Sequence, residues 1–282
     1  MSAKYYVAMT RPVNSALSGA GALFAVMVYS NYSVTSTPLL LCAFTTGYFL
    51  TASAMLINDV VDLEVDRVNK PWKPLPSGKA SPRTALALAV LLFIAGVLCN
   101  LAVSIWTLLV ALTYGSIGVL YSYLRKHWWS SKLVAFSTTG PVIYGYTVAG
   151  FPTDTRVFTV IFALSIFLVT LGREVLKSIQ DYRGDLVKGY KTIATVYGLN
   201  TAYRAMLLVG VLGALLALST TALQVVSTPY KALISLAAVV YVSSIARAYI
   251  NRETTQLEKQ RKRTLHAMVI GTVAFWLSKL PL

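Results

Sequence analysis

Acidic residues are scarce in this chain. Only 10 of its 282 residues are Asp or Glu, against 25 Lys or Arg, and charged residues of both signs make up 12% of the sequence. Soluble domains carry about 25% charged residues, so this composition argues against an ordinary water-soluble fold. Because 56% of the residues are hydrophobic, we expect an integral membrane protein.

Cysteine and histidine are also rare, with two of each. Cys42 and Cys99 fall within apolar stretches and lack the close spacing of metal ligands, which favours ordinary buried thiols over a disulfide framework or a zinc site. The net charge of +15 is spread over short segments between apolar stretches. This distribution is typical of topology signals and of contacts with anionic lipid headgroups, and we expect no nucleic-acid partner.

The hydrophobic residues are grouped into nine stretches of about membrane-spanning length. The sequence therefore predicts an all-α, polytopic membrane protein. We expect a bundle of nine transmembrane helices around a central cavity open to the cytoplasmic side, within a single domain of residues 1–282. The predicted spans are 13–33, 38–57, 83–103, 105–123, 133–151, 156–176, 203–226, 229–249 and 265–281.

The positions of the basic residues predict an orientation. If the N-terminus is cytoplasmic, all of the 25 Lys and Arg residues except Arg156, Lys231 and Lys279 fall in cytoplasmic segments. Cytoplasmic loops are enriched in Lys and Arg, so this division supports the span count. We expect a multi-pass protein of the cell membrane with its N-terminus in the cytoplasm and its C-terminus outside.

Seven of the ten acidic residues lie in two short clusters, within residues 58–66 and 173–185. In the first acidic motif, Asn58, Asp62 and Asp66 are spaced i, i+4 and i+8, which places them in one row along a helix. A second row contains Arg173, Lys177 and the acidic motif of Asp181 and Asp185. Stacked carboxylates at a bilayer boundary are costly unless something compensates their charge, so these rows are not expected to be ordinary solvated helix ends.

The two rows predict a magnesium site. Mg²⁺ prefers carboxylates, waters and substrate phosphate oxygens as ligands, and neither row contains His or Cys. Asp62 and Asp181 are separated by the same 119 positions as Asp66 and Asp185, which suggests two facing halves that each contribute an acidic helix end. The candidate metal ligands are Asn58, Asp62, Asp66, Asp181 and Asp185.

Basic residues flank both rows. Cations around an anionic leaving group stabilise the charge that develops as a phosphate ester bond breaks. The segment between the first row and the next span contains Pro71, Pro74, Pro76 and Pro82, so it cannot form a continuous helix. The candidate diphosphate-binding residues are Arg67, Lys70, Lys73, Arg173 and Lys177.

These motifs resemble the UbiA superfamily of intramembrane prenyltransferases. The resemblance rests on Asn58-Asp59-x-x-Asp62-x-x-x-Asp66, on the segment 73–78 (Lys-Pro-Leu-Pro-Ser-Gly) and on Asp181-x-x-x-Asp185. The segment 10–14 (Thr-Arg-Pro-Val-Asn) and Tyr121-x-x-x-Arg125-Lys126 also match family positions.

The resemblance implies that two Mg²⁺ ions bridge a prenyl diphosphate between the rows and that its ionisation gives an allylic carbocation. It adds Arg11 and Asn14 to the substrate-binding residues. As catalytic residues it implies Asp62, Asp66, Asp181, Asp185, Lys126 and Tyr121. Aromatic faces can stabilise such a cation, and the other tyrosine candidates are Tyr114, Tyr144 and Tyr146.

The segment 173–177 (Arg-Glu-Val-Leu-Lys) resembles the archaeal branch of the superfamily, the digeranylgeranylglyceryl phosphate synthases. That resemblance implies transfer of a geranylgeranyl group to the hydroxyl of a lipid glycerol phosphate in membrane ether-lipid synthesis. Members of this branch often carry further acids where this chain has Ser178 and Gln180.

Two alternatives remain open. An aromatic prenyltransferase of quinone synthesis, with an acceptor such as 4-hydroxybenzoate, would use the same metal site and the same diphosphate donor. A cation-coupled transporter would need ionisable residues near the middle of the bilayer, whereas here the acids lie at predicted helix ends. The basic residues near both rows favour an acceptor that carries phosphate.

Overall fold

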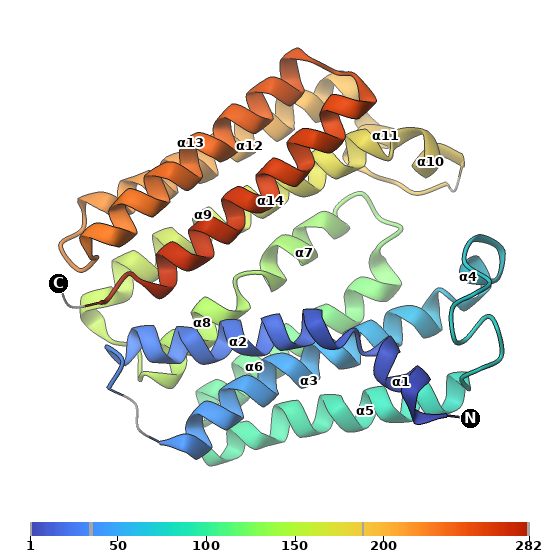
Figure 1. Cartoon of the computed structure of the whole chain (residues 1–282), viewed down its shortest axis with the longest axis horizontal. Helices are drawn as coiled ribbons and strands as arrows, with labels where there is room; N and C mark the ends of the chain where they lie inside the picture. Colours follow the sequence, from blue (N-terminus) through green and yellow to red (C-terminus); the bar gives the residue numbers. More distant parts are fainter. Residues whose placement is uncertain (1, 34–35, 188, 281–282) are drawn as a thin grey trace. The chain divides into compact units, whose positions relative to one another are not determined.

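The computed structural model describes residues 2–33, 36–187 and 189–280. This part of the chain is helical and contains no strand. It divides into two compact units, one formed by residues 1–27, 34–123 and 140–150 and the other by 28–33, 124–139 and 151–282 (Figure 1). The first acidic motif belongs to unit 1 and the second to unit 2.

Unit 1 is built around α3, which packs against α5 and leads to the first acidic motif. A buried cluster beneath this motif contains Met9, Leu56, Ile57, Leu75 and Ala80. Its helices are α1 (Ala3–Met9), most of α2 (Pro12–Tyr29), α3 (Thr37–Val61), α4 (Leu63–Asn69), α5 (Pro82–Leu98), η1 (Cys99–Ala102), nearly all of α6 (Ile105–Leu124) and α8 (Gly140–Val148).

Unit 2 is organised around α9, which contacts α7, α12 and α14, while α13 packs on both α12 and α14. Its core lies at the end of α9 that leads to the second acidic motif, with Val175, Leu176 and Ile179 among the buried residues. Its helices are α7 (Ser130–Ser137), η2 (Thr153–Thr155), α9 (Arg156–Gln180), α10 (Tyr182–Val187), α11 (Ile193–Tyr197), α12 (Leu199–Ser219), η3 (Thr220–Ala222), α13 (Thr228–Ile250) and α14 (Thr254–Trp276).

Within the described residues, seven helical stretches are long and apolar enough to cross a membrane. They are Pro12–Tyr29, Thr37–Val61, Pro82–Ala102, Ile105–Leu124, Thr153–Gln180, Leu199–Ala222 and Thr228–Ile250. Several also expose apolar stripes, such as Leu86, Val90 and Ile94 on α5. Such stripes suit lipid rather than water, and the all-helical, multi-pass prediction is confirmed.

Two predicted spans take a different form. The stretch 133–151 is divided between α7 and α8, which fall in different units and are separated by Thr138 and Thr139. The stretch predicted at 265–281 is the second half of α14, which begins at Thr254 and has a charged first half. The end of that prediction, at Pro281, lies outside the described residues, as does Lys188 of the predicted cytoplasmic set.

The crossing of α2 and α3 depends on two glycines. A Cβ atom on Gly47 would lie 2.6 Å from the carbonyl oxygen of Ser18, and one on Gly19 would lie 2.7 Å from that of Phe44. Real Cβ atoms do not approach a backbone oxygen this closely. Small residues at membrane helix crossings permit such backbone contact, so the two glycines set the distance between α2 and α3.

We expect Gly47→Val to force α2 and α3 apart and to lower the free energy of unfolding by about 1–3 kcal/mol, as overpacking does in other cores. The measurement is denaturant unfolding in mild detergent. Gly21→Ala, on the same α2, is the matched control, because its added methyl would meet nothing closer than 3.6 Å. Equal stability of the two variants would contradict this account of the crossing.

Candidate active site

The first acidic row crosses a junction between two helices. Helix α3 ends at Val61, Asp62 has φ −85° and ψ 0°, and α4 begins at Leu63. The backbone N–H of Asp62 still donates to the carbonyl of Asn58 at 3.0 Å, and that of Asp66 donates to the carbonyl of Asp62 at 2.8 Å. The three predicted ligands therefore keep helical spacing across the break.

The second acidic row has the same local structure. Helix α9 ends at Gln180, Asp181 has φ −87° and ψ 3°, and α10 begins at Tyr182. The N–H of Asp181 donates to the carbonyl of Lys177, and that of Asp185 to the carbonyl of Asp181, both at 2.9 Å. Each row therefore keeps helical spacing while crossing a junction between two helices. Asp is a poor residue for a helix interior, which is consistent with breaks at Asp62 and Asp181.

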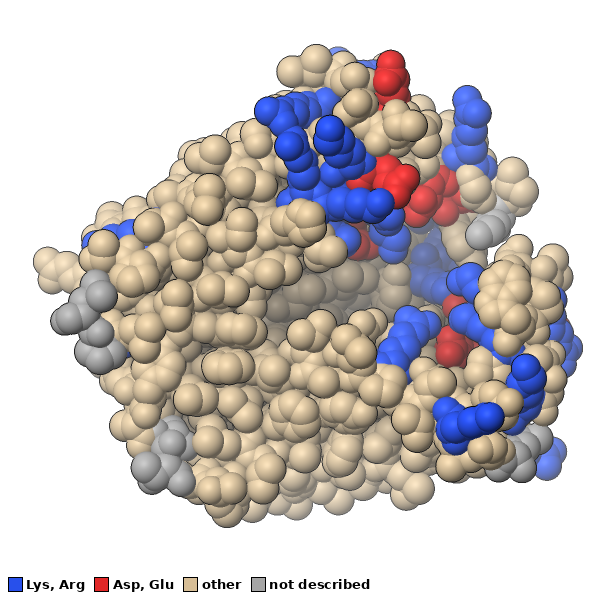
Figure 2. Space-filling view, viewed as in Figure 1, with Lys and Arg blue, Asp and Glu red and all other residues tan. Residues whose placement is uncertain are grey.

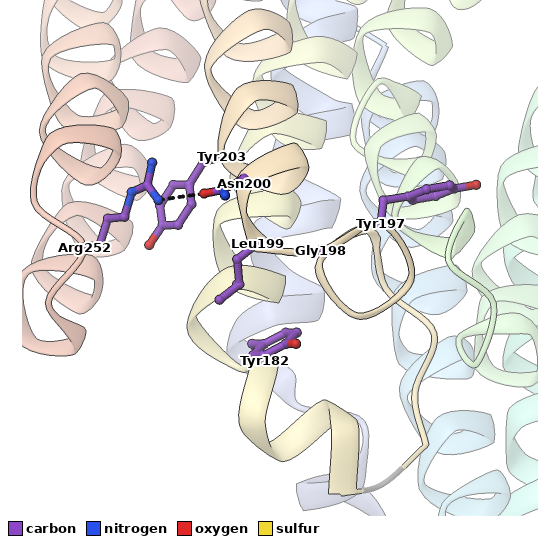
Figure 3. Close-up of a pocket in the computed structure, with 7 residues that line it drawn as sticks. All are labelled: Tyr182, Tyr197, Gly198, Leu199, Asn200, Tyr203 and Arg252. Atoms are coloured by element: carbon purple, nitrogen blue, oxygen red, sulfur yellow. Dashed lines mark hydrogen bonds between the residues drawn. The ribbon is translucent and has the colours of Figure 1, made fainter.

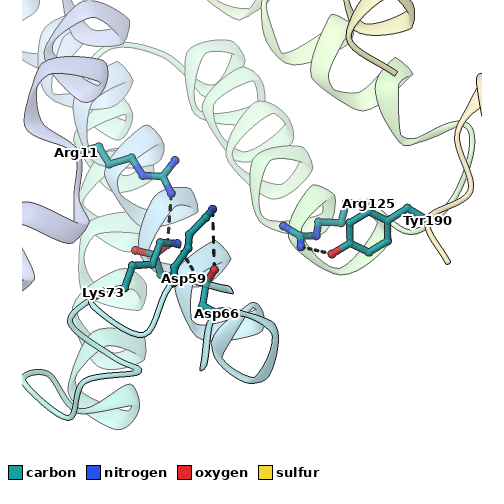
Figure 4. Close-up of polar contacts among 7 residues, drawn as sticks. Arg11, Asp59, Asp66, Lys73, Arg125 and Tyr190 are labelled. Carbon is teal, nitrogen blue, oxygen red and sulfur yellow. Dashed lines mark hydrogen bonds and ion pairs between the residues drawn. The ribbon is translucent and has the colours of Figure 1, made fainter. Parts of the chain in front are cut away.

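The carboxylates of unit 1 are held by cations (Figure 4). Lys73 Nζ lies 2.9 Å from Asp59 Oδ1 and 2.6 Å from Asp66 Oδ2, and Arg11 Nη2 lies 3.3 Å from Asp59 Oδ1. Asp59, Asp62 and Asp66 are all buried. Buried charges of one sign require compensation, and Arg11 and Lys73 supply it for Asp59 and Asp66. In Figure 2 the basic side chains seen on unit 1 likewise gather near its carboxylates.

Arg11 reaches this cluster from an unusual backbone conformation. It lies between α1 and α2 and has φ +48°, in the left-handed region that residues other than glycine seldom adopt. The turn is held by hydrogen bonds from the Thr10 hydroxyl to the carbonyl of Val7 and from the Ser15 hydroxyl to the carbonyl of Thr10. Backbone strain of this kind is typical of functional sites.

Lys73 lies in the folded, non-helical segment between α4 and α5, as the prolines of that segment predict. Leu75 and Ala80 of this segment are buried in the core beneath the motif. Burial opposes the charge on Lys73, but hydrogen bonds to Asp66 and Asp59 outweigh that effect and raise its pKa above the ordinary value. Lys73 is therefore a fixed positive charge beside the first row.

Buried polar atoms without a hydrogen-bond partner lie in or beside both rows. Among the described residues, Asn58 Oδ1, Gln180 Oε1 and Arg173 Nε are buried without a hydrogen bond. A buried polar atom without a hydrogen bond costs free energy unless a bound ligand or ion supplies the missing interaction. In the first row, Asn58 precedes Asp62 by four positions and Asp66 by eight. An amide oxygen and two carboxylates form an all-oxygen donor set of the kind that suits Mg²⁺.

No group of three His, Cys, Asp or Glu side chains close enough to hold a metal ion occurs in the described part of the chain. In unit 1 the Lys73 ammonium bridges Asp59 and Asp66. In unit 2, Asp181 is exposed and Asp185 is half-buried.

Several predicted substrate-binding residues have carboxylate partners. Arg67 pairs with Glu64 at 3.0 Å on an exposed face, whereas Lys70 is exposed and lies 4.0 Å from Asp66. In unit 2, Arg173 and Lys177 lie 3.5 and 3.8 Å from Glu174. Asn14 and Lys126 are exposed, and Tyr121 is half-buried.

Sequence reasoning missed two carboxylates. Asp59 lies one position after Asn58, off the helical row, yet it joins Arg11 and Lys73. Glu174 was not assigned a role, yet it lies between the cations of the second row. The available signals were the position of Asp59 beside Asn58 in the first motif and the position of Glu174 within the segment 173–177.

Tyr144 has a structural role in unit 1. Its hydroxyl donates to Asn100 Oδ1 at 2.8 Å, and the Asn100 amide donates to Thr46 Oγ1 at 3.0 Å. Thr46 lies three helical turns before Asn58 on α3, so this buried network is remote from the first row along the helix. The structure therefore gives Tyr144 hydrogen-bonding partners rather than a place beside the carboxylates.

A separate hollow of about 530 Å³ lies in unit 2 (Figure 3). On one side, the Arg252 guanidinium lies 4.4 Å from the centre of the Tyr203 ring and donates to Asn200 Oδ1 at 2.9 Å. These contacts fasten the connection between α13 and α14 to the beginning of α12. The full lining is Tyr182, Tyr197, Gly198, Leu199, Asn200, Tyr203 and Arg252, and it contains no member of either row.

A sequence profile of the UbiA prenyltransferase family matches residues 19–276. The chain belongs to this family. It is 33% identical over 285 aligned positions to a digeranylgeranylglyceryl phosphate synthase of Saccharolobus solfataricus, with 100% of this chain and 99% of the relative covered. The corresponding enzyme of Methanosphaera stadtmanae is 26% identical, with 96% and 97% covered.

Solved structures share this UbiA fold. A structure of digeranylgeranylglyceryl phosphate synthase superimposes with a TM-score of 0.87 at 24% identity, covering 99% of each chain. A UbiA homologue from Archaeoglobus fulgidus, solved with GPP and Mg²⁺, gives a TM-score of 0.67 at 17% identity, covering 96% of this chain and 99% of that one. At these identities the likeness concerns the fold alone.

Proposed function

We propose that this UbiA-family chain transfers a geranylgeranyl group from its diphosphate to the hydroxyl of a lipid glycerol phosphate, in membrane ether-lipid synthesis. The observation that carries the proposal is the end-to-end similarity to the Saccharolobus solfataricus synthase. The cluster of Arg11, Lys73, Asp59 and Asp66 supports it, because cations and oxygen ligands lie together at one helix end.

The proposed site uses both acidic rows on one prenyl diphosphate. Two Mg²⁺ ions, held by Asn58, Asp62 and Asp66 on one side and by Asp181 and Asp185 on the other, would neutralise the diphosphate and stabilise it as a leaving group. The two junctions have the same backbone geometry, with Asp62 and Asp181 at the two helix breaks, which supports equivalent roles for the rows.

The basic residues act on the phosphate oxygens. As the bond between prenyl C1 and the diphosphate oxygen breaks, its electron pair passes to that oxygen, where Arg11 and Lys73 stabilise the negative charge. The acceptor oxygen then forms a bond to C1, and its proton passes to the released diphosphate. Apolar helix walls exclude water, which would otherwise capture the allylic cation. Arg173 and Lys177 are the proposed phosphate contacts of unit 2, Lys126 is a proposed catalytic residue, and Tyr121 is a proposed cation-stabilising residue.

We further propose that both units work as one domain, residues 1–282, with nine spans around a central cavity open to the cytoplasm. The α7 and α8 pair and the apolar half of α14 would supply the two spans beyond the seven long apolar helices. The distribution of Lys and Arg supports a cytoplasmic N-terminus and an external C-terminus.

The test is a turnover assay of purified protein with Mg²⁺ and geranylgeranyl diphosphate, offered geranylgeranylglyceryl phosphate or 4-hydroxybenzoate in parallel. We expect product only with the glyceryl phosphate and none when EDTA removes the metal. Product only with the benzoate would assign the chain to quinone synthesis and overturn the proposed acceptor. Full turnover in EDTA would overturn the metal site.

A further inference from the structure

A short segment of unit 2, residues 189–192, is hydrogen-bonded both to the second acidic motif and to the loop between α6 and α7. The N–H of Tyr190 donates to the carbonyl of Asp185 at 2.9 Å, and the carbonyl of Tyr190 accepts from the Thr195 hydroxyl at 2.9 Å. The N–H of Lys191 donates to the carbonyl of Lys126 at 3.2 Å. The backbone of Tyr190 is therefore held on both of its sides.

The side chain of Tyr190 is engaged with Arg125. Arg125 Nη2 donates to the Tyr190 hydroxyl at 2.7 Å, and the guanidinium carbon lies 5.4 Å from the centre of the ring (Figure 4). A hydrogen bond together with a cation–π contact restricts the guanidinium in both position and tilt. Tyr190 thus holds Arg125 from the segment that follows Asp185.

This arrangement favours binding of phosphate. Arg is suited to phosphate because its planar fork of five N–H donors forms paired hydrogen bonds with phosphate oxygens. An unrestrained Arg side chain loses about 2 kcal/mol of rotamer entropy when it is fixed by a ligand. A guanidinium that is already held loses less, so the same phosphate binds more tightly.

We propose that Tyr190 is a positioning residue for prenyl transfer, which orients the Arg125 guanidinium to bind the diphosphate of the prenyl donor. The inference rests on the proposed function, since it takes its ligand from the second acidic row. Tyr190 does not touch the reacting atoms. It acts through Arg125, and its own place is set by the backbone of Asp185.

The test compares Tyr190→Phe, which keeps the ring and removes the hydroxyl, with Tyr197→Phe. Tyr197 is a matched control because it lies on the neighbouring α11 and its ring contacts Trp128, with a centroid distance of 5.4 Å. The readouts are the Mg²⁺-dependent Kd for inorganic pyrophosphate, the KM for each substrate and the melting temperature.

We expect Tyr190→Phe to raise the pyrophosphate Kd and the KM for geranylgeranyl diphosphate about tenfold, the size expected for a lost hydrogen bond to a charged group. The acceptor KM and the melting temperature stay unchanged, and Tyr197→Phe behaves like the unaltered protein. In a double-mutant cycle, Arg125→Lys and Tyr190→Phe together raise the pyrophosphate Kd little more than Arg125→Lys alone.

A pyrophosphate Kd within twofold of the unaltered value in Tyr190→Phe would overturn the inference. The inference would also be overturned if the effects of Arg125→Lys and Tyr190→Phe on the pyrophosphate Kd multiplied in the double variant. A fall in melting temperature without a change in Kd would overturn it too, because it would assign Tyr190 a purely structural role. Absence of Mg²⁺-dependent pyrophosphate binding in the unaltered protein is a distinct result, which would overturn the proposed function together with the inference.

Discussion

Asp62→Asn and Asp181→Asn are each expected to lower kcat for prenyl transfer by at least about a hundredfold to a thousandfold, the loss seen when one preorganised stabilising group is removed from a reacting site. Both substitutions conserve side-chain size while removing the negative charge. Asp181 is exposed, so its replacement tests charge with little effect on packing. Steady-state kinetics with geranylgeranyl diphosphate and the glyceryl phosphate acceptor provide the measurement.

The matched control is Asp154→Asn. Asp154 belongs to neither row, is exposed and pairs with Lys279 at 3.1 Å, so the substitution should leave kcat unchanged. Near-normal turnover in Asp62→Asn or Asp181→Asn would contradict the assignment of that row to the metal. Loss of the folded state in either variant would show up as a lower melting temperature, which separates structural failure from catalytic failure.

Lys73→Met is expected to destabilise the protein more than any other single charge removal described above. Lys73 is 20% exposed at its side chain, and its partners Asp59 and Asp66 are 8% and 5% exposed. Removing one member of a fully buried pair costs 3–5 kcal/mol, so about 2–3 kcal/mol is expected for this partly buried one. Denaturant unfolding in detergent measures the change.

The control for this prediction is Lys70→Met. Lys70 is 53% exposed and 4.0 Å from Asp66, so its removal should cost less than about 1 kcal/mol, as for a surface pair. Adding Asp59→Asn to Lys73→Met should recover part of the loss, because one uncompensated carboxylate is then neutral. Equal stability of the two lysine variants would show that Lys73 does not hold the acidic cluster together.

The main architecture could be predicted from the sequence because membrane helices leave a strong signal. Long apolar stretches can be recognised without knowledge of tertiary contacts. The identical spacing of the two acidic pairs also proved informative, since Asp62 and Asp181 occupy matching helix junctions. Local pattern was sufficient for each of these features.

Other features depend on contacts between distant residues. The ion pair of Asp59 joins residues 48 positions apart, and no helical period predicts it. The division of the stretch 133–151 into α7 and α8 is invisible to hydrophobicity, because both halves are apolar. The early start of α14 was missed for the opposite reason: its first turns are charged, so an apolar scan does not detect them.

We propose above that both acidic rows bind one prenyl diphosphate through divalent metal. The most direct test counts Mn²⁺ ions bound per chain by electron paramagnetic resonance, with a non-reactive geranylgeranyl thiolodiphosphate present. We expect two ions in the unaltered protein, and a loss of bound metal together with weaker analogue binding in both Asp62→Asn and Asp181→Asn. Unchanged metal and analogue binding in either variant would contradict it.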